Sequence, residues 1–180
     1  MRNFLKNFFK KKSNIKEDIY KRYTLPKIQE FQNIIETKDK ISFLHYGHLG
    51  DIINSLPVIK EISKNKQCSL YIQKNKLIPK HVVSKDHPFG AVYLTENSII
   101  KILPLLRQQK YLKNVEIYSD QKIDVDLNFF RELPINFNID SVRWYFHLTG
   151  CFPNLSYKYL EVENHEKFKD HIVIMRSLRR

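Results

Sequence analysis

A strand–helix–strand pattern within residues 41–73 limits the fold of this chain more than any other feature of its sequence. Residues 41–46, ISFLHY, form a short run of apolar, β-branched and aromatic side chains that is typical of a buried strand. Residues 51–64 place apolar side chains at helical spacing, and residues 68–73, CSLYIQ, predict a second strand. Two strands joined by one helix at this spacing predict a parallel pair with a right-handed crossover. Pro57 lies within the helical pattern, so we expect a kink or a late helix start there.

The remaining pattern predicts further helices and strands on both sides of this unit. Residues 15–38 predict a helix before and after Pro26, and residues 74–96 are loop-like. An alternating stretch at 122–130 predicts a strand with four apolar side chains on one face, Ile123, Val125, Leu127 and Phe129. The other predicted elements are helices at 97–112, interrupted by Pro104, and at 139–149, closed by Gly150, and strands at 115–120, 157–162 and 171–175. We therefore expect an α/β, Rossmann-like three-layer domain with a mostly parallel sheet at 41–170, preceded by helices in a basic segment at 1–40.

The composition indicates one well-buried domain in a reducing compartment. The chain has 180 residues, 42% of them apolar, which is enough for one hydrophobic core. It contains no run of about 18 apolar residues, and its basic start lacks the apolar stretch of a secretory signal. Cys68 and Cys151 have no metal-type spacing, so we expect reduced thiols and a cytoplasmic location.

Positive charge is concentrated at the start of the chain. The net charge is +12, and residues 1–40 contribute half of it, with 11 Lys and Arg against 5 Asp and Glu. Four apolar residues within 1–12 form one face of a helix with lysines around it, Phe4, Leu5, Phe8 and Phe9. This pattern is typical of an interfacial helix on anionic lipid, although a helix packed on the domain fits it too. A basic chain also suits phosphorylated substrates or nucleic acid, but no groove-reading or stacking motif supports nucleic acid as a partner.

The junction at 45–52, HYGHLGDI, is the best candidate for a ligand site. It holds Gly47 and Gly50, two of only four glycines in the chain, between the first predicted strand and its helix. We expect both glycines to allow positive φ and to leave room for a ligand at the carboxyl end of the strand. The start of the predicted helix offers unpaired N–H groups and the positive end of the helix dipole, which suit an anion. Asp51 is interpreted either as the N-cap of this helix or as a general base at the mouth of a cleft.

Other side chains are candidates for the same cleft. His48 could hold an acceptor or its phosphate, Asn54 could line the cleft or lie on the helix surface, and Arg131 could point into the cleft. His45 is expected to be packed rather than to form a metal pair with His48, so we expect no metal.

Two further groups of side chains have a structural and a functional interpretation. For Asp124 and Asp126 the preferred interpretation is a solvated strand face, and the alternative is a paired-carboxylate site. For residues 143–146, RWYF, the preferred interpretation is packing of a helix, and the alternative is stacking of the aromatic rings on a sugar.

The stretch GDIINSLPVIKEIS resembles the N-terminal signature of the heptosyltransferase-like glycosyltransferases of the GT-B fold. The matching residues are Gly50, Asp51, Ile52, Ile53, Leu56, Pro57 and Ile59. The resemblance implies two Rossmann-like domains facing each other across a cleft, with residues 41–170 as the acceptor-side domain. It implies that Asp51 deprotonates the acceptor hydroxyl. It also implies a nucleotide sugar as co-substrate, with no other cofactor and no metal.

The same resemblance makes residues 171–180 the start of a second, donor-binding domain. HIVIM resembles the first strand of that domain, and Arg176 and Ser177 would face the donor phosphates. We therefore expect the N-terminal half of an inverting glycosyltransferase that acts on a glycan or lipid-linked acceptor, incomplete without a second-half polypeptide. Its expected location is the cytoplasm, at the inner face of the membrane. The alternative is a non-catalytic Rossmann-like module that binds an anionic glycan or a partner protein.

Overall fold

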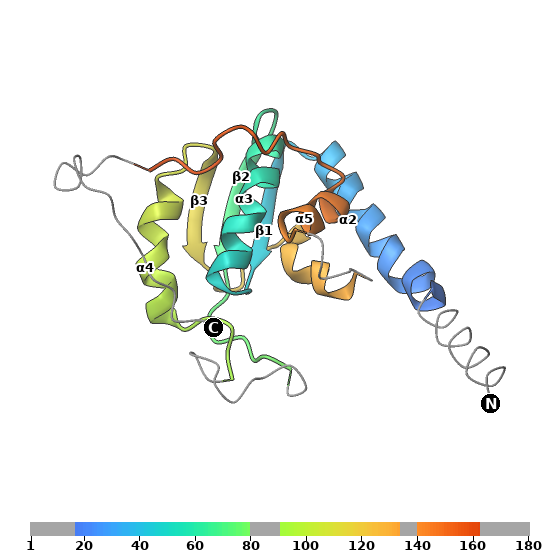
Figure 1. Ribbon diagram of the computed structural model, residues 1–180, viewed down its shortest axis with the longest axis horizontal. Helices are drawn as coiled ribbons and strands as arrows, with labels where there is room; N and C mark the ends of the chain where they lie inside the picture. Colours follow the sequence, from blue (N-terminus) through green and yellow to red (C-terminus); the bar gives the residue numbers. More distant parts are fainter. Residues whose placement is uncertain (1–16, 80–90, 134–139, 163–180) are drawn as a thin grey trace.

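Four parallel strands in the order β3-β2-β1-β4 form the sheet at the centre of the fold (Figure 1). The computed structural model describes residues 17–79, 91–133 and 140–162. The strands are β1 (Lys40–His45), β2 (Gln67–Ile72), β3 (Leu112–Ile117) and β4 (Val125–Asp126). The helices are η1 (Tyr20–Thr24), α2 (Leu25–Thr37), α3 (Leu49–Ser63), α4 (Glu96–Arg107), η2 (Leu127–Glu132) and α5 (Val142–Thr149). An α/β, Rossmann-like domain with a parallel sheet and flanking helices is therefore confirmed.

The unit of β1, α3 and β2 has the predicted parallel pairing. β1 and β2 run side by side in register from Lys40 opposite Gln67 to His45 opposite Ile72. Every second residue of each strand is buried, which places the apolar side chains of both strands in one layer of the core. α3 begins at Leu49 and continues through Pro57, so the predicted late helix start is wrong.

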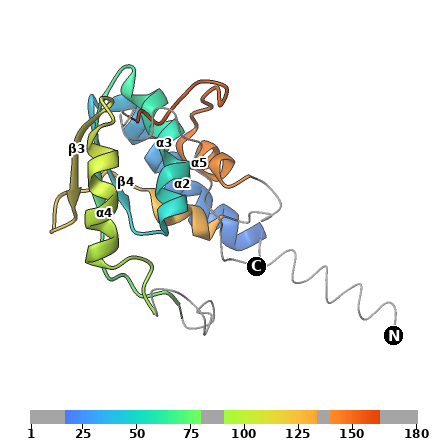
Figure 2. The same cartoon turned by 60° about the vertical axis from the view of Figure 1, so that its left-hand side comes forward.

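The helices pack against the sheet and against one another, and α5 contacts both α2 and α3 (Figure 2). α3 and α4 lie next to each other, and each contacts a strand, α3 with β2 and α4 with β3. α2 and α5 pack together beside β1, the strand that pairs with the short β4. α4 continues through Pro104 and ends at Arg107, five residues earlier than predicted. β3 starts at Leu112, three residues earlier than predicted. The helix at 139–149 ends as predicted, because Gly150 adopts the left-handed conformation (φ 70°) and donates its N–H to Phe146 O.

The predicted strand at 122–130 is correct for only two residues. β4 stops at Asp126, whose side chain accepts the N–H of Asn128 at 2.9 Å and caps the 3₁₀ helix η2. Leu127 and Phe130 are buried, whereas the predicted strand would have buried Phe129 on the same face as Leu127. This spacing of three is that of a 3₁₀ helix, so the local cap overrides the alternating pattern.

The predicted strand at 157–162 is wrong, because this stretch has no regular secondary structure. Two residues between α4 and β3, Gln109 and Tyr111, form hydrogen bonds with its backbone. Gln109 donates to Glu161 O at 2.9 Å and accepts the Glu161 N–H at 2.8 Å, and the Tyr111 hydroxyl donates to Tyr159 O at 2.8 Å. The side chains of Gln109 and Tyr111 thus replace the ladder of hydrogen bonds that a strand would need.

The helical segment before the sheet is confirmed between residues 17 and 37, with one π-helical turn, η1, and Pro26 in the first turn of α2. The predicted interfacial helix at 1–12, the strand at 171–175, and Arg176 and Ser177 lie outside the described residues. In the part of the chain that is described, no helix is long and apolar enough to cross a membrane.

Candidate functional site

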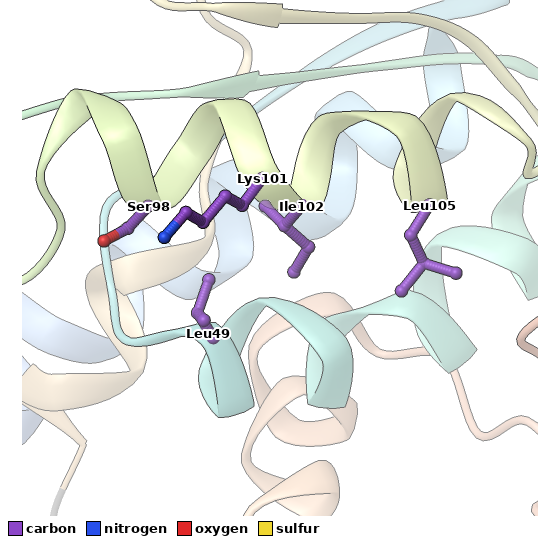
Figure 3. Close-up of a pocket in the computed structure, with 5 residues that line it drawn as sticks. All are labelled: Leu49, Ser98, Lys101, Ile102 and Leu105. Atoms are coloured by element: carbon purple, nitrogen blue, oxygen red, sulfur yellow. The ribbon is translucent and has the colours of Figure 1, made fainter.

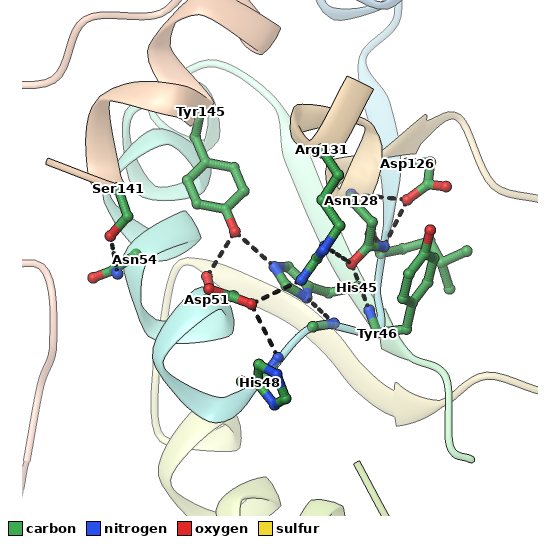
Figure 4. A network of polar contacts seen from close by, with 12 residues as sticks. His45, Tyr46, His48, Asp51, Asn54, Asp126, Asn128, Arg131, Ser141 and Tyr145 are labelled. Atoms are coloured by element: carbon green, nitrogen blue, oxygen red, sulfur yellow. Dashed lines mark hydrogen bonds and ion pairs between the residues drawn. The ribbon is translucent and has the colours of Figure 1, made fainter. Parts of the chain in front are cut away.

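A cluster of polar side chains lies where β1 and β4 end and where α3 and η2 begin (Figure 4). Its members come from four elements and from the loop after β1, and they are His45, Tyr46, His48, Asp51, Asn128, Arg131 and Tyr145. This edge of the sheet is where open parallel sheets bind ligands, because the strands present their carboxyl ends there.

Asp51 is the third residue of α3, not its N-cap. The N-cap is His48, whose backbone N–H donates to Asp51 Oδ2 at 3.1 Å, and the two residues form a capping box. The predicted N-cap position of Asp51 is therefore wrong by three residues, although its carboxylate still stabilises the start of this helix. The side chain is 21% exposed, so a ligand can reach it.

Arg131 points into this cluster and forms an ion pair with Asp51. Its Nη2 lies 2.8 Å from Asp51 Oδ2, across 80 residues of sequence. Its Nη1 donates to Asn128 Oδ1 at 3.3 Å, and its guanidinium lies 4.3 Å from the Phe130 ring and 4.7 Å from the Tyr93 ring. Two acceptors and two aromatic rings therefore fix the guanidinium, which is still 23% exposed.

The contacts that His48 and Arg131 make with the Asp51 carboxylate both use Oδ2. Among the described residues, no hydrogen-bond donor contacts Oδ1. Asp51 thus has one oxygen held by Arg131 and the helix start, and a second oxygen that could accept a proton or a hydrogen bond from a ligand hydroxyl.

His45 and Tyr145 connect the floor of the site to the backbone of α3. His45 Nδ1 accepts the Gly47 N–H at 3.0 Å, so the ring proton of the neutral imidazole resides on Nε2. Nε2 then donates to the Tyr145 hydroxyl at 3.0 Å, and this hydroxyl donates to Asp51 O at 2.9 Å. Burial, and secondarily the charge of Arg131, lowers the pKa of His45 to about 3, so this ring is neutral at physiological pH. Burial also raises the pKa of Tyr145 well above its ordinary value.

The packing predicted for His45 is confirmed, because its side chain is fully buried. Tyr145 was expected to pack, with sugar stacking as the alternative, and the sequence did not connect it to Asp51. Asn128 was missed entirely. Its Oδ1 accepts the Tyr46 N–H at 2.9 Å, and its Nδ2 donates to Asp126 Oδ1 at 2.6 Å. The only signal for Asn128 in the sequence is a polar residue within an otherwise apolar run.

The two glycines of the junction have different roles from those expected. Neither has positive φ, since Gly150 is the only glycine of the described residues with that conformation. Gly47 is required by space, because a Cβ there would lie 2.7 Å from Asp51 Oδ2 and 2.8 Å from Arg131 Nη2. Gly50 lies in the first turn of α3, and a Cβ there would meet nothing within 4 Å.

The other predicted side chains lie near the site or away from it. The His48 ring packs edge-on against Tyr93, with 5.2 Å between centroids, and so lies at the margin of the cluster. Asn54 instead donates to Ser141 Oγ at 2.5 Å and links α3 to the residue before α5.

The paired acids near β4 are structural. Asp124 accepts the Ser42 N–H at 2.9 Å and forms an ion pair with Lys38. Although burial raises the pKa of Asp124, hydrogen bonds from Lys38 and Ser42 lower it below its ordinary value. The predicted solvated face is therefore wrong for Asp124, since its carboxylate is bound by Ser42 of β1 and by Lys38 at the end of α2.

Within the described ranges, no group of three or more His, Cys, Asp or Glu side chains could hold a metal ion. Both cysteines are free thiols.

No family model matches the chain, and no curated protein or solved structure matches it either. The fold and the site therefore define the class by themselves. It is a Rossmann-like α/β domain with an aspartate–arginine pair at the carboxyl edge of its parallel sheet.

Proposed function

We propose that this chain is the acceptor-binding half of an inverting glycosyltransferase that uses a nucleotide-sugar donor. The observation that carries the proposal is the Asp51 carboxylate, which lies partly exposed at the carboxyl end of β1 with Oδ2 held by Arg131. The reaction itself, sugar transfer, is proposed because residues 50–59 resemble the heptosyltransferase-like signature.

In the proposed reaction, Asp51 acts as the general base. Its carboxylate removes the proton of an acceptor hydroxyl, and the hydroxyl oxygen attacks the anomeric carbon of the donor sugar. The bond from that carbon to the phosphate oxygen breaks, and the nucleoside diphosphate leaves with the electron pair. Attack from the face opposite the leaving group inverts the anomeric configuration. Arg131 positions Asp51 and offers its remaining N–H donors to an anionic group on the acceptor.

The proposed enzyme needs a second Rossmann-like half for the donor, in which Arg176 and Ser177 would contact the donor phosphates. The acceptor is a glycan or a lipid-linked sugar, and the reaction takes place at the cytoplasmic face of the membrane. Gly47 and His48 would shape the acceptor site around Asp51.

The second candidate function is a non-catalytic module that binds an anionic glycan or a partner protein. The observation that favours it is that the Asp51 carboxylate already has two structural tasks, the capping box and the ion pair with Arg131. Those tasks alone explain an aspartate at this position.

Sugar transfer distinguishes the two functions. Transfer from a panel of nucleotide sugars should be measured with this chain alone and with this chain joined to a downstream donor half. In Asp51→Asn the amide oxygen can still accept the His48 N–H, so we expect a small loss of stability, about 1 kcal/mol, and a loss of transfer of at least 100-fold.

The matched control is Asp39→Asn, an exposed aspartate just before β1, at the opposite end of this strand. Transfer that Asp39→Asn retains and Asp51→Asn loses, at similar melting temperatures, supports the enzyme. Transfer in no combination, or a fully active Asp51→Asn variant, rules out the proposed base and leaves the binding module.

A further inference from the structure

A groove between α3 and α4 has an apolar and a cationic end (Figure 3). Its volume is about 360 Å³, and five side chains line it, Leu49, Ser98, Lys101, Ile102 and Leu105. Ile102 and Leu105 point from α4 toward α3 and form the apolar part, and Leu49 of α3 lies opposite Lys101 and Ile102. The Lys101 ammonium and the Ser98 hydroxyl lie together toward the start of α4.

The charge at the polar end is not neutralised by the protein. Among the described residues Lys101 forms no ion pair, and its side chain is exposed. The first turn of α4 is already capped, because Thr95 Oγ1 accepts the Ser98 N–H at 3.3 Å, and its acidic residue, Glu96, is paired with Lys74. An anionic group at this end would be stabilised by the Lys101 ammonium and the Ser98 hydroxyl together.

From this polarity we propose that the groove binds a single-chain anionic amphiphile, with its hydrocarbon chain on Leu49, Ile102 and Leu105 and its phosphate at Lys101 and Ser98. Charge complementarity selects this occupant, since a neutral chain leaves Lys101 unused and a basic peptide is repelled by it. The groove starts at Leu49, two residues before Asp51, so the polar end lies at the same edge of the sheet as the candidate site. The proposal does not depend on sugar transfer.

The test measures the binding of octyl phosphate and decyl phosphate to the full chain by calorimetry, below the concentrations at which these compounds form micelles. Each buried methylene group should strengthen binding up to about fourfold, so decyl phosphate should bind roughly tenfold more tightly than octyl phosphate. Octyl glucoside, a neutral amphiphile with the same chain, should bind more weakly than octyl phosphate.

Two variants and two controls locate the site. Leu105→Asn should weaken the binding of decyl phosphate at least tenfold, whereas Ile100→Asn, an exposed neighbour on the same helix and outside the groove lining, should not. Lys101→Gln should weaken the alkyl phosphates about threefold to fivefold and leave octyl glucoside unchanged, with exposed Lys110→Gln as the control. If Leu105→Asn does not fold, Leu49→Asn tests the opposite wall of the groove.

Three results would overturn the proposal. The first is equal affinity for octyl phosphate and octyl glucoside, which would mean that no head group is recognised. The second is binding that Leu105→Asn and Lys101→Gln leave unchanged. The third is a dimer of this chain that Leu105→Asn dissociates, which would make the groove a contact between copies. Because no sugar donor is present, a failure here leaves the glycosyltransferase proposal standing, and the reverse also holds.

Discussion

At the scale of single residues, the two glycines beside Asp51 should respond in opposite ways to the same substitution. Gly47→Ala places a methyl group within 2.8 Å of Asp51 Oδ2, Arg131 Nη2 and His45 Cε1. These atoms are held by hydrogen bonds, an ion pair and ring packing, so the methyl group should displace the ion pair. We expect Gly47→Ala to lower the free energy of unfolding by about 1–3 kcal/mol, measured by urea denaturation.

Gly50→Ala is the matched control for this prediction. Its methyl group meets nothing within 4 Å, and alanine is the better helix former in the first turn of α3. The free energy of unfolding should stay the same or rise by up to about 1 kcal/mol. Equal effects of the two substitutions would contradict the packing of Asp51 and Arg131 over Gly47.

His45 should make the stability of this domain fall as the pH is lowered. Its pKa is about 3 in the folded protein and about 6.5 in the unfolded chain, so between these values the unfolded state binds the extra proton. Stability from the neutral ring is fully present above pH 6.5 and is lost as the pH falls toward 3. We expect a loss of about 2 kcal/mol between pH 7 and pH 5, measured by urea denaturation at fixed salt.

The control is His45→Gln, which removes the titrating group and keeps a polar side chain at the end of β1. This variant should be less stable than the parent at pH 7, but its stability should change much less between pH 7 and pH 5. A parent protein with constant stability over that interval would show that His45 is accessible to protons in the folded state.

At the scale of secondary-structure elements, the coil at 151–162 is held by the buried side chain of Gln109, together with contacts from Tyr111 and Lys60. Gln109 bonds both backbone groups of Glu161 and also donates to Leu105 O. Gln109→Leu fills the same space and leaves these backbone groups unpaired, so we expect a loss of about 1–3 kcal/mol in stability. Hydrogen exchange at the Glu161 amide should become faster, as measured by NMR or mass spectrometry.

The control is Gln108→Leu, at the neighbouring residue, whose side chain is exposed and forms no hydrogen bond among the described residues. Exchange at Glu161 should be unchanged in this variant. If Gln109→Leu also leaves that amide protected, the coil at 151–162 is held by its other contacts, such as the one from Tyr111 to Tyr159.

The elements with a strong apolar pattern could be predicted from the sequence, and the elements fixed by single polar contacts could not. The strands at 41–46 and 68–73 and the helix between them were predicted within two residues, because burial of their apolar faces determines them. The stretch 122–130 was predicted as a longer strand because its alternation is real. Its outcome depends on one cap, from Asp126 to the Asn128 N–H, which the pattern does not contain.

At the scale of the whole molecule, the basic start of the chain predicts binding to anionic membranes. Residues 1–12 combine four apolar residues with lysines, so the full chain should sediment with vesicles of phosphatidylglycerol and not with vesicles of phosphatidylcholine. The double substitution Phe4→Ser and Phe8→Ser should reduce this binding at least tenfold, because it removes half of the apolar face.

The control for membrane binding is Phe152→Ser, which removes an exposed phenylalanine from the coil after α5, where the side chain is 76% exposed. This variant should sediment with the vesicles as the parent does. If it loses binding as well, the membrane contact is not confined to residues 1–12. High salt should weaken the parent's binding, since screening reduces the attraction of lysines to anionic lipid.

The sequence by itself determined the α/β class, the parallel pairing of the first two strands and the edge at which a ligand site could lie. These features follow from local patterns of burial, which repeat every two or every 3.6 residues. Only the tertiary structure decided the environment of Asp51. Arg131 is 80 residues away in the chain, and Tyr145 is 94 residues away. The contacts of Asp51 depend on how η2 and α5 pack beside β1, which no local pattern encodes.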